Sequence, residues 1–452
     1  MQKIFNPYSG ELIGEEQFTS CDELFVQAKN ACSYHQRQVL STSERIFLVE
    51  KLAQLFESNK VCFAELITQE TGKTITDAKL EVSRSINLIK HFIFEMQTLK
   101  GELLLNHGQG FSSQKWGLIE RIPIGCILCI TPFNFPLILT LHKIIPAFLM
   151  GNSVLLKPGP SNILVTKKLM TIIEQAGFPL DAIQMIYPEI PDLTQLISSD
   201  KIDAISLTGG ISTARAIAKN SGMKKLLLEL GGNDVMIIFP DANLEQACDN
   251  LINGRFGGAG QKCNAPKKVF IHQDVYDQFK NLLLEKSSKL IYGDPALPET
   301  FLGPVISLAS SDLIQNRIDQ AIHSGAKLLL GGKKIKNLCL PTILENVDHQ
   351  LPLVKDETFG PVISLFNFTE TKKLIAICNE SEFGLQAGIY TQNINTIKYF
   401  FKKLQVATVI ANDGPNFRID HFPFGGIKNS GNTREGGKFS LEEYSQIKTL
   451  IW

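Results

Sequence analysis

The chain has 452 residues, which is too long for one simple hydrophobic core and predicts two or three structural units. Its 45 basic side chains balance 45 acidic ones, so we expect no nucleic-acid partner and no membrane partner. The N-terminus is polar and lacks an apolar signal segment, while nine thinly spread cysteines favour reduced thiols. The expected location is therefore the cytoplasm.

The spacing of apolar residues predicts that the chain before residue 122 is mainly helical, with helices over 43–60 and 76–101. Later, short β-rich runs alternate with helical segments such as 161–177, where Ser161 can act as N-cap and Gly177 can end the helix. This alternation predicts an α/β protein with parallel sheets and two α/β domains, joined by a hinge near Gly231 and Gly232. The predicted strands are 124–130, 153–157, 182–187, 203–208 and 224–230, followed by 235–239, 267–272, 361–366, 386–391 and 407–412.

The uncharged segment 122–141 is long enough to span a membrane, but its three prolines favour a buried strand, a turn and a helix. Within that strand Cys126 and Cys129 have the spacing of a redox motif. They point to opposite faces, and no second cysteine pair completes a zinc site. We interpret both as core residues and expect no metal.

A cysteine in a glycine-rich loop, 258-GAGQKCNAPKK-268, raises the question of nucleophilic chemistry. A thiol that attacks a carbonyl needs donors for the oxyanion and a base for later water attack. Asn134, between two prolines, can donate, and Glu229 ends an apolar strand where burial raises a carboxyl pKa. Taken singly, each has a plainer explanation: a buried thiol at Cys263, a turn residue, and a solvated strand end.

Two features suit a phosphate-bearing ligand. The strand 203–208 is followed by 209-GGISTARAIAKN-220, a glycine turn that opens a helix. Lys157 lies at the C-terminal end of a predicted strand, where ligands bind in open α/β sheets. Because Ile211 and Ala214 replace two glycines of the dinucleotide fingerprint, an ordinary βα turn is the better explanation of this segment taken alone.

Six motifs together resemble the aldehyde dehydrogenase superfamily, and the resemblance covers nearly the whole chain. They are TPFNFP, GNSVLLKP, LELGG, GQKCNA, KDETFGPV and PFGGIKNSG, in the family's order, with Cys263 34 positions after Glu229. The resemblance implies a Rossmann-like dinucleotide-binding domain, a second α/β catalytic domain and a small β oligomerisation element. Their expected ranges are 1–101 with 122–231, then 232–430, and finally 102–121 with 431–452.

The resemblance also implies roles for individual residues. Cys263 would form a thiohemiacetal with an aldehyde, held by Asn134 and the Cys263 N–H. Hydride transfer to NAD or NADP would leave a thioester, which water activated by Glu229 would hydrolyse to the free acid. Lys143 matches a family lysine close to the active site. The implied cofactor-binding residues are Lys157, Gly209, Gly210, Glu357, Phe359, Pro132, Phe133 and Leu230.

Departures from the family pattern bear on cofactor choice. Pro160 stands where NAD-preferring members usually carry a ribose-binding glutamate, so the usual barrier to NADP is missing and NADP is expected to be usable. Gly210 and Ala214 also differ from common family residues at the phosphate turn.

Two basic residues bear on substrate choice. Lys262 precedes the nucleophile, and Arg418 lies in 412-NDGPNFRIDHFPFGG-426, similar to the branch containing non-phosphorylating glyceraldehyde-3-phosphate, lactaldehyde and phosphonoacetaldehyde dehydrogenases. Both side chains would hold a small anionic aldehyde. Alternatively, Arg418 pairs with Asp413 or Asp420, Lys262 faces solvent, and the substrate is succinate semialdehyde, a hydroxyaldehyde or an aliphatic aldehyde.

Two other classes of function compete with an aldehyde dehydrogenase. A cysteine hydrolase would need a histidine base, and the eight histidines form no catalytic motif. A catalytically silent binding protein would not require Cys263, Glu229 and Asn134 together.

The resemblance also implies a homodimer or homotetramer, in which the C-terminal segment, about 440–452, joins a neighbour's sheet. The apolar end QIKTLIW agrees with this expectation, because an exposed apolar strand favours pairing with another chain.

Overall fold

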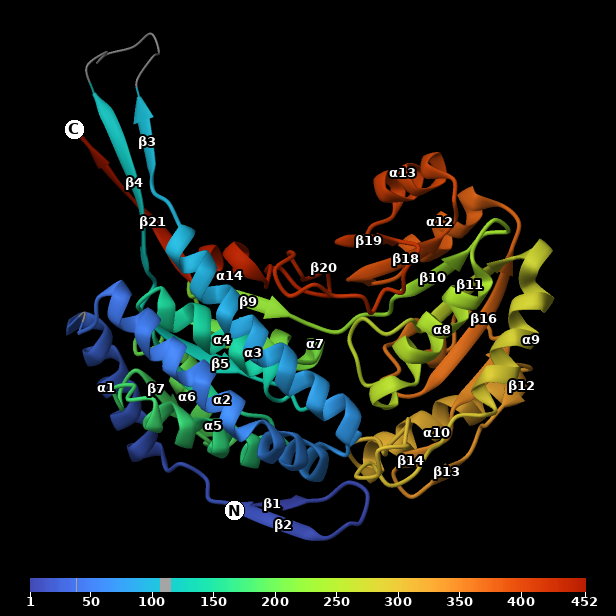
Figure 1. Cartoon of the computed structure of the whole chain (residues 1–452), viewed down its shortest axis with the longest axis horizontal. Helices are drawn as coiled ribbons and strands as arrows, with labels where there is room; N and C mark the ends of the chain where they lie inside the picture. The colour runs from blue at the N-terminus through green and yellow to red at the C-terminus, as the bar shows by residue number, and fades with distance from the viewer. Residues whose placement is uncertain (38, 106–114) are drawn as a thin grey trace.

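The structure is a computed structural model that describes residues 1–37, 39–105 and 115–452. Two α/β lobes lie side by side, and a narrow arm that carries the C-terminus projects from one of them (Figure 1). The chain begins with an antiparallel hairpin and three helices: β1 (Gln2–Phe5), β2 (Leu12–Glu16), α1 (Cys21–Arg37), α2 (Thr42–Thr71) and α3 (Ile75–Thr98).

The first lobe contains a five-stranded parallel sheet in the order β7-β6-β5-β8-β9. The chain starts in the middle at β5, adds β6 and β7 on one side, and then returns to add β8 and β9 on the other. Such a reversal opens a crevice at the carboxyl ends of the strands. The elements are β5 (Cys126–Ile130), α4 (Ile138–Leu149), β6 (Ser153–Lys157), α5 (Ile163–Gln175), β7 (Ile183–Met185), α6 (Ile190–Ser198), β8 (Ala204–Thr208), α7 (Ile211–Asn220) and β9 (Lys225–Glu229).

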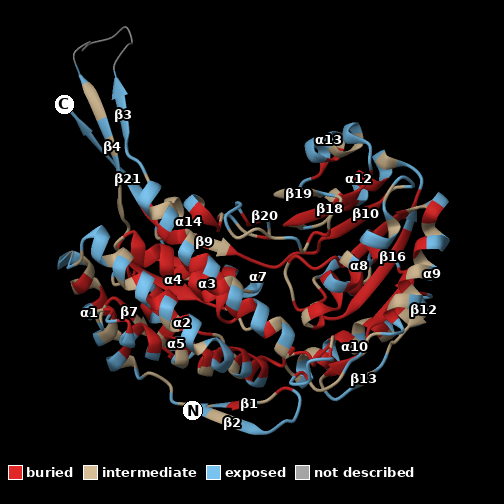
Figure 2. Ribbon diagram, in the orientation of Figure 1, coloured by how far each residue is buried: buried red, intermediate tan, exposed pale blue. Residues whose placement is uncertain are grey.

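Helices cover both faces of this sheet, and its central strands are buried (Figure 2). On one face Cys129 packs with residues of α2, α3, α4 and α5. On the other face Cys126 packs with residues of α1, α6 and α7. The prediction that both cysteines are core residues is therefore confirmed, and all nine cysteines are free. The segment 122–141 forms a strand, a turn and the start of α4, and no helix in the described part of the chain could cross a membrane.

The second lobe contains a seven-stranded sheet in the order β12-β15-β16-β11-β10-β18-β19. Only β12 runs antiparallel to its neighbour. Its strands are β10 (Val235–Ile238), β11 (Lys268–His272), β12 (Lys327–Leu330), β15 (Thr342–Glu345), β16 (Val362–Phe368), β18 (Gln386–Tyr390) and β19 (Thr408–Ala411). Its helices are α8 (Leu244–Arg255), η1 (Gly257–Gly260), η2 (Gln273–Val275), α9 (Tyr276–Ser287), α10 (Leu308–His323), α11 (Pro352–Lys355), α12 (Thr371–Asn379) and α13 (Ile394–Lys403).

The arm is a separate three-stranded antiparallel sheet in the order β21-β4-β3. The C-terminal segment pairs with β4 of its own chain, and its expected contact with a neighbour's sheet stays a prediction. The arm consists of β3 (Glu102–Leu105), β4 (Trp116–Pro123) and β21 (Ser445–Ile451), with α14 (Gly437–Glu443) before it. Two short ladders complete the structure: β13 (Lys334–Ile335) with β14 (Leu338–Cys339), and β17 (Phe383–Gly384) with β20 (Ile427–Lys428).

The predicted α/β class with parallel sheets is confirmed, and each predicted strand overlaps an observed one. The predicted cap of α5 was wrong, because the N-cap residue is Asn162 rather than Ser161. The fully buried Asn162 amide donates instead to Pro132 O (3.1 Å) and Pro136 O (3.3 Å), which ties α5 to the loop after β5. A long-range contact therefore decides where this helix begins.

Candidate active site

The predicted site residues meet where the two sheets face each other. The five-stranded sheet presents its carboxyl ends, where β6 ends at Lys157 and β9 ends at Glu229. The seven-stranded sheet presents its amino ends: Cys263 lies just before β11, and Glu357 lies just before β16. The two sheets therefore contribute opposite ends of their strands to one site.

The chain crosses between the sheets at Gly231 and Gly232, and both are buried. A Cβ atom on Gly231 would lie 2.2 Å from Glu357 Oε2, and one on Gly232 would lie 2.5 Å from Cys263 O. Close approach of other backbone and side-chain atoms therefore requires these glycines. The hinge predicted at this point stays a prediction.

A cavity of about 550 Å³ opens onto the nucleophile candidate. Residues from both lobes line it, so it lies across the junction rather than within one sheet. They include Asn134, His142, Lys262, Cys263, Arg418, Arg84 and Phe424. Its volume suits a small organic ligand.

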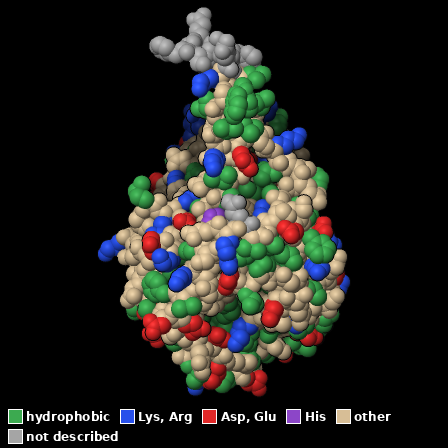
Figure 3. Space-filling model, turned by 90° about the vertical axis from the view of Figure 1, so that its left-hand side faces the viewer, with side chains coloured by type: hydrophobic (Ala, Val, Ile, Leu, Met, Phe, Trp, Pro, Cys, Tyr) green, Lys and Arg blue, Asp and Glu red, His purple; other side chains and the backbone are tan. Residues whose placement is uncertain are grey.

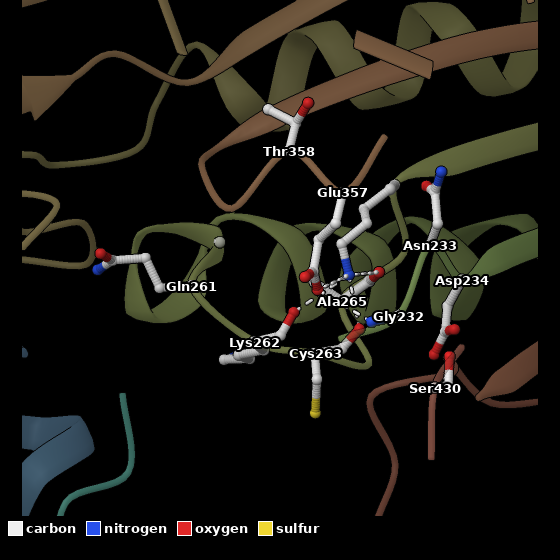
Figure 4. Close-up of polar contacts among 12 residues, drawn as sticks. Gly232, Asn233, Asp234, Gln261, Lys262, Cys263, Ala265, Glu357, Thr358 and Ser430 are labelled. Atoms are coloured by element: carbon white, nitrogen blue, oxygen red, sulfur yellow. Dashed lines mark hydrogen bonds and ion pairs between the residues drawn. The ribbon is translucent and has the colours of Figure 1, made fainter. Parts of the chain in front are cut away.

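Cys263 is half-buried in the loop after η1, and its sulfur points away from the polar contacts made by the backbone around it (Figure 4). Burial raises the pKa of the Cys263 thiol well above its usual range, and the nearby Glu229 carboxylate raises it further. The ammonium of Lys267 acts in the opposite direction. In the protein without ligands, Cys263 is therefore mainly a thiol at neutral pH, and reaction requires loss of its proton.

Glu229 is 1% exposed, and neither carboxylate oxygen has a hydrogen-bond partner among the described residues. Burial, and then the neighbouring Glu435 carboxylate, raise the pKa of Glu229 to about 8. A carboxyl group with that pKa can accept a proton near neutral pH and release it again. The expected strand-end glutamate is thus buried rather than solvated.

Asn134 lines the cavity in the loop between β5 and α4. Its side-chain amide donates to Gln261 O at 2.9 Å, which links the loop to the segment before Cys263 and leaves one N–H for a ligand. The end of the loop is fixed by Glu81, whose carboxylate accepts from Leu137 N (2.9 Å) and Ile138 N (3.2 Å) at the start of α4.

Lys143, predicted to be catalytic, is 1% exposed and does not line the cavity. Its ammonium donates to Glu435 Oε1 and to Ser206 Oγ, both at 3.1 Å. Since Glu435 is one of the groups that raise the pKa of Glu229, Lys143 is electrostatically connected to that carboxyl group. Its predicted role stays a prediction.

The predicted cofactor residues lie around the same crevice. Lys157 donates only to Pro158 O (3.0 Å), and its ammonium lies 5.3 Å from the ring centre of Tyr187. Gly209 and Gly210 precede α7, and a Cβ atom on Gly210 would meet nothing closer than 3.9 Å. The open N-terminus of α7 suits a phosphate group.

At the other end of this crevice, Glu357 accepts a hydrogen bond from Gly232 N at 3.0 Å. Phe359 packs edge-to-face against Phe133 with ring centres 6.1 Å apart, so the two lobes meet here. Pro132 lies beside Phe133 in the same loop, and Leu230, 6% exposed, follows Glu229. A half-buried carboxylate, apolar rings and an open helix end fit a dinucleotide.

The two predicted substrate-binding cations both line the cavity. Lys262 is half-buried rather than solvent-facing, and its ammonium donates to Asn253 O at 3.2 Å. No carboxylate in the described part of the chain lies within ion-pair distance of that ammonium. Arg418 lies 3.6 Å from Asp420, one of the two carboxylates expected to pair with it if it does not bind substrate. It also lies 3.4 Å from Glu435, and its guanidinium stacks on the Phe424 ring, 4.0 Å from the ring centre.

Two polar residues beside Arg418 were not predicted from the sequence. His142, fully buried, lies with Nε2 2.9 Å from Arg418 Nη2, and Arg84 pairs with Asp420 at 2.8 Å. His142 directly precedes Lys143 in the sequence, but no role was predicted for it. Arg84 lies on a long helix without any local motif, and its pairing with Asp420 spans 336 positions.

Comparison with known proteins gives consistent matches along the whole chain. A model of the Aldehyde dehydrogenase family matches residues 1–450. The chain is 43% identical over 451 residues to a sulfoacetaldehyde dehydrogenase of Neptuniibacter caesariensis, covering 99% of this chain and 98% of the relative. It is 36% identical over 458 residues to a lactaldehyde dehydrogenase of Methanococcus aeolicus, covering 99% and 96%. A glyceraldehyde-3-phosphate dehydrogenase (GapN) of Methanocaldococcus jannaschii, solved with NADP, matches with a TM-score of 0.95 and 35% identity, covering 100% of this chain and 99% of that chain.

The raised pKa of Glu229 predicts a pH-dependent effect of Glu229→Gln on stability. The folded state keeps the Glu229 proton up to about pH 8, whereas the unfolded state releases it near pH 4.5. Stability contributed by Glu229 is therefore lost as pH rises through this window. Because glutamine does not titrate, the melting temperature of the variant should rise relative to wild type from pH 5 to 8 and then level off.

Thermal unfolding at several pH values measures this difference, which corresponds to at most about 1.4 kcal/mol per pH unit. Cys263→Ser is the control, since the thiol does not titrate below pH 8 and should give a constant offset. A Glu229→Gln difference that is also constant with pH contradicts the buried, protonated carboxyl group.

Proposed function

This chain belongs to the aldehyde dehydrogenase family and is an NAD(P)-dependent oxidoreductase, and we propose that it oxidises a small anionic aldehyde, with sulfonate as the preferred anion. The observation that carries the choice of substrate is the Lys262 ammonium, which lines the cavity beside Cys263 and has only a backbone oxygen as its acceptor. A half-buried cation without a carboxylate partner favours an anionic ligand. The 43% identical sulfoacetaldehyde dehydrogenase supports sulfonate over phosphate.

The reaction begins at Cys263, whose thiolate sulfur adds to the aldehyde carbon to form a thiohemiacetal. The Cys263 N–H and the free N–H of Asn134 stabilise the oxyanion that develops in this step. When bound, NAD(P) supplies the hydride acceptor that converts the thiohemiacetal to a thioester. Glu229, in its ionised form, then takes a proton from the attacking water, and cleavage of the thioester releases the carboxylic acid and the Cys263 thiol.

Lys157, the N-terminus of α7 and Glu357 would hold the dinucleotide through its adenosine ribose, pyrophosphate and nicotinamide ribose. The Lys157 ammonium has no carboxylate partner in the described residues, and Pro160 adds no negative charge nearby. A free cation beside an uncharged residue favours the 2′-phosphate, so NADP is the proposed cofactor. The 35% identical glyceraldehyde-3-phosphate dehydrogenase solved with NADP supports this choice.

The positions of Lys262 and Arg418 at the cavity account for both the anionic charge and the small size of the proposed substrate. Lys262 is the neighbour of the nucleophile, so an anion that it binds must lie within a few bonds of the aldehyde carbon. Arg418 would contribute from the loop after β19, since its Nη1 atom has no partner in the described part of the chain. An anionic two- or three-carbon aldehyde would contact both cations, whereas an aliphatic aldehyde leaves Lys262 without an anionic partner.

The arm supports assembly into a homo-oligomer. Registered residues on its three strands form an apolar row of Leu103, Leu118 and Leu450, which are 59%, 40% and 50% exposed. Both outer strands have a free edge, and apolar side chains gather on this part of the arm (Figure 3). An exposed apolar sheet with free edges is stabilised by pairing with another copy.

Reduction of NADP, followed at 340 nm, should occur with sulfoacetaldehyde as the best substrate. The panel also contains glyceraldehyde 3-phosphate, phosphonoacetaldehyde, lactaldehyde, succinate semialdehyde and propanal, each with NAD and NADP. Cys263→Ser should lower kcat by about 10³-fold or more, because serine is a much weaker nucleophile. Equal kcat/KM for propanal and sulfoacetaldehyde would refute the anionic substrate, and silence with every aldehyde would refute the proposed activity.

Replacing Arg418 should affect anionic substrates selectively. We expect Arg418→Leu to lower kcat/KM for sulfoacetaldehyde by about 10²-fold, since a buried charge contact is lost, and that for propanal by less than threefold. Arg434→Leu is the matched control, because Arg434 donates to Gly426 O and Thr433 O and does not line the cavity. Equal losses for both aldehydes would assign Arg418 to folding alone.

Charges on the arm should abolish assembly. The double variant Leu118→Asp, Leu450→Asp should run as a monomer of about 50.2 kDa in light scattering, while wild type runs as a multiple of this mass. Thr449→Asp changes a neighbouring residue on the opposite face of β21 and should leave assembly intact. A monomeric wild type excludes the proposed oligomer.

A further inference from the structure

Lys267, four residues after the nucleophile, is buried at the start of β11 with 4% of its surface exposed. Its ammonium donates to Cys263 O at 2.6 Å, to Lys262 O at 3.2 Å and to Ala265 O at 3.4 Å. These three carbonyl groups use all three protons of the ammonium. It also lies 3.6 Å from Glu357 Oε1, and Figure 4 shows the Glu357 carboxylate and the carbonyl oxygens of this loop converging on one nitrogen atom.

Those bonds determine the orientation of the peptide units on both sides of the nucleophile. The Lys262 carbonyl and the Cys263 N–H belong to one planar unit, and the chain has no cis peptide among its described residues. In a trans unit the carbonyl and the N–H point in opposite directions. When Lys267 binds the Lys262 oxygen, the Cys263 N–H is therefore turned away from the ammonium.

The Cys263 N–H has no acceptor within the described part of the protein. A free backbone donor beside a nucleophile is the group that an oxyanion hole requires. The second bond, to the Cys263 oxygen, fixes the following peptide unit and prevents the loop from turning that donor inward. A cation on the carbonyl also polarises the peptide unit and strengthens its N–H as a donor.

We propose that Lys267 is the positioning residue of the oxyanion hole: it fixes the two peptide units that flank Cys263 and so directs the Cys263 N–H toward the developing oxyanion. Lys267 itself touches neither substrate nor cofactor. The inference deepens the proposed function, since it rests on Cys263 as nucleophile. It explains why a charged side chain is buried behind a catalytic loop, where an apolar residue would otherwise avoid the cost of desolvation.

The test compares two reactions of the Cys263 thiolate that need neither aldehyde nor dinucleotide. Acylation by p-nitrophenyl acetate forms a tetrahedral oxyanion before p-nitrophenolate leaves, whereas alkylation by iodoacetamide displaces iodide without one. Both rates are proportional to the thiolate fraction, so their ratio is independent of the thiol pKa. In Lys267→Met this ratio should fall by about tenfold or more, since a misdirected oxyanion donor loses much of its effect.

Lys268→Met is the matched control. Lys268 is the next residue and 7% exposed, but its ammonium has no contact with Lys262, Cys263 or Glu357 among the described residues. In Lys268→Met, the ratio of the acylation rate to the alkylation rate should equal that of wild type. Lys267→Gln keeps an amide donor without the charge and should give a ratio between those of wild type and Lys267→Met. If the methionine variant does not fold, as judged by circular dichroism, a threefold or larger fall in Lys267→Gln supports the proposal.

Three results would overturn the proposal. Equal falls in the acylation and alkylation rates would mean that Lys267 affects only the thiolate, and unchanged rates would give it no role. Failure of wild-type Cys263 to be acylated, while it is alkylated, would mean that no oxyanion-stabilising group accompanies the thiol. A protein that is acylated but oxidises no aldehyde would keep the role of Lys267 and refute the proposed function.

Discussion

The close approach of a carboxylate at Gly231 and of a backbone carbonyl at Gly232 is the constraint on which the site depends. Because these residues lack Cβ atoms, the Glu357 carboxylate and the Cys263 carbonyl can lie against the chain segment that follows β9, the strand that ends at Glu229. The carboxyl edge of one sheet can then face the amino edge of the other. A side chain at either position would separate the base from the nucleophile and the nucleophile from the proposed ribose ligand.

Such close packing removes water from ionisable groups, and the site's chemistry follows from that loss. Burial raises the pKa of Glu229 to about 8 and raises that of Cys263, so both groups are mainly neutral at pH 7. Lys143, which pairs with Glu435, and Lys267, which binds the nucleophile loop, supply compensating positive charge. The protein therefore maintains groups that can exchange protons without exposing them to bulk water.

Sequence reasoning predicted the strands because parallel strands buried on both faces are continuous apolar runs, as in β5 and β8. It predicted Cys263 as nucleophile and Glu229 as base because both residues belong to motifs that occur together in the family's order. It could not predict partners of distant residues, such as Arg84 with Asp420 or His142 with Arg418, because local periodicity contains no information about tertiary pairing. Lys267 was missed for the same reason: its carbonyl acceptors have no signature in the side-chain sequence.

Charge balance in the cavity is the physical basis for the proposal that this neutral protein selects an anion. Arg84 pairs with Asp420, Lys73 pairs with Glu81, and Arg418 is partly neutralised by Asp420 and Glu435. Lys262 alone among these cations contacts no carboxylate in the described structure, so its charge remains for the ligand. Since the other cations are paired, the position of the unpaired one would determine where the proposed anion binds. That position is adjacent to the nucleophile, so in the proposed function the same residue would set both charge recognition and substrate length.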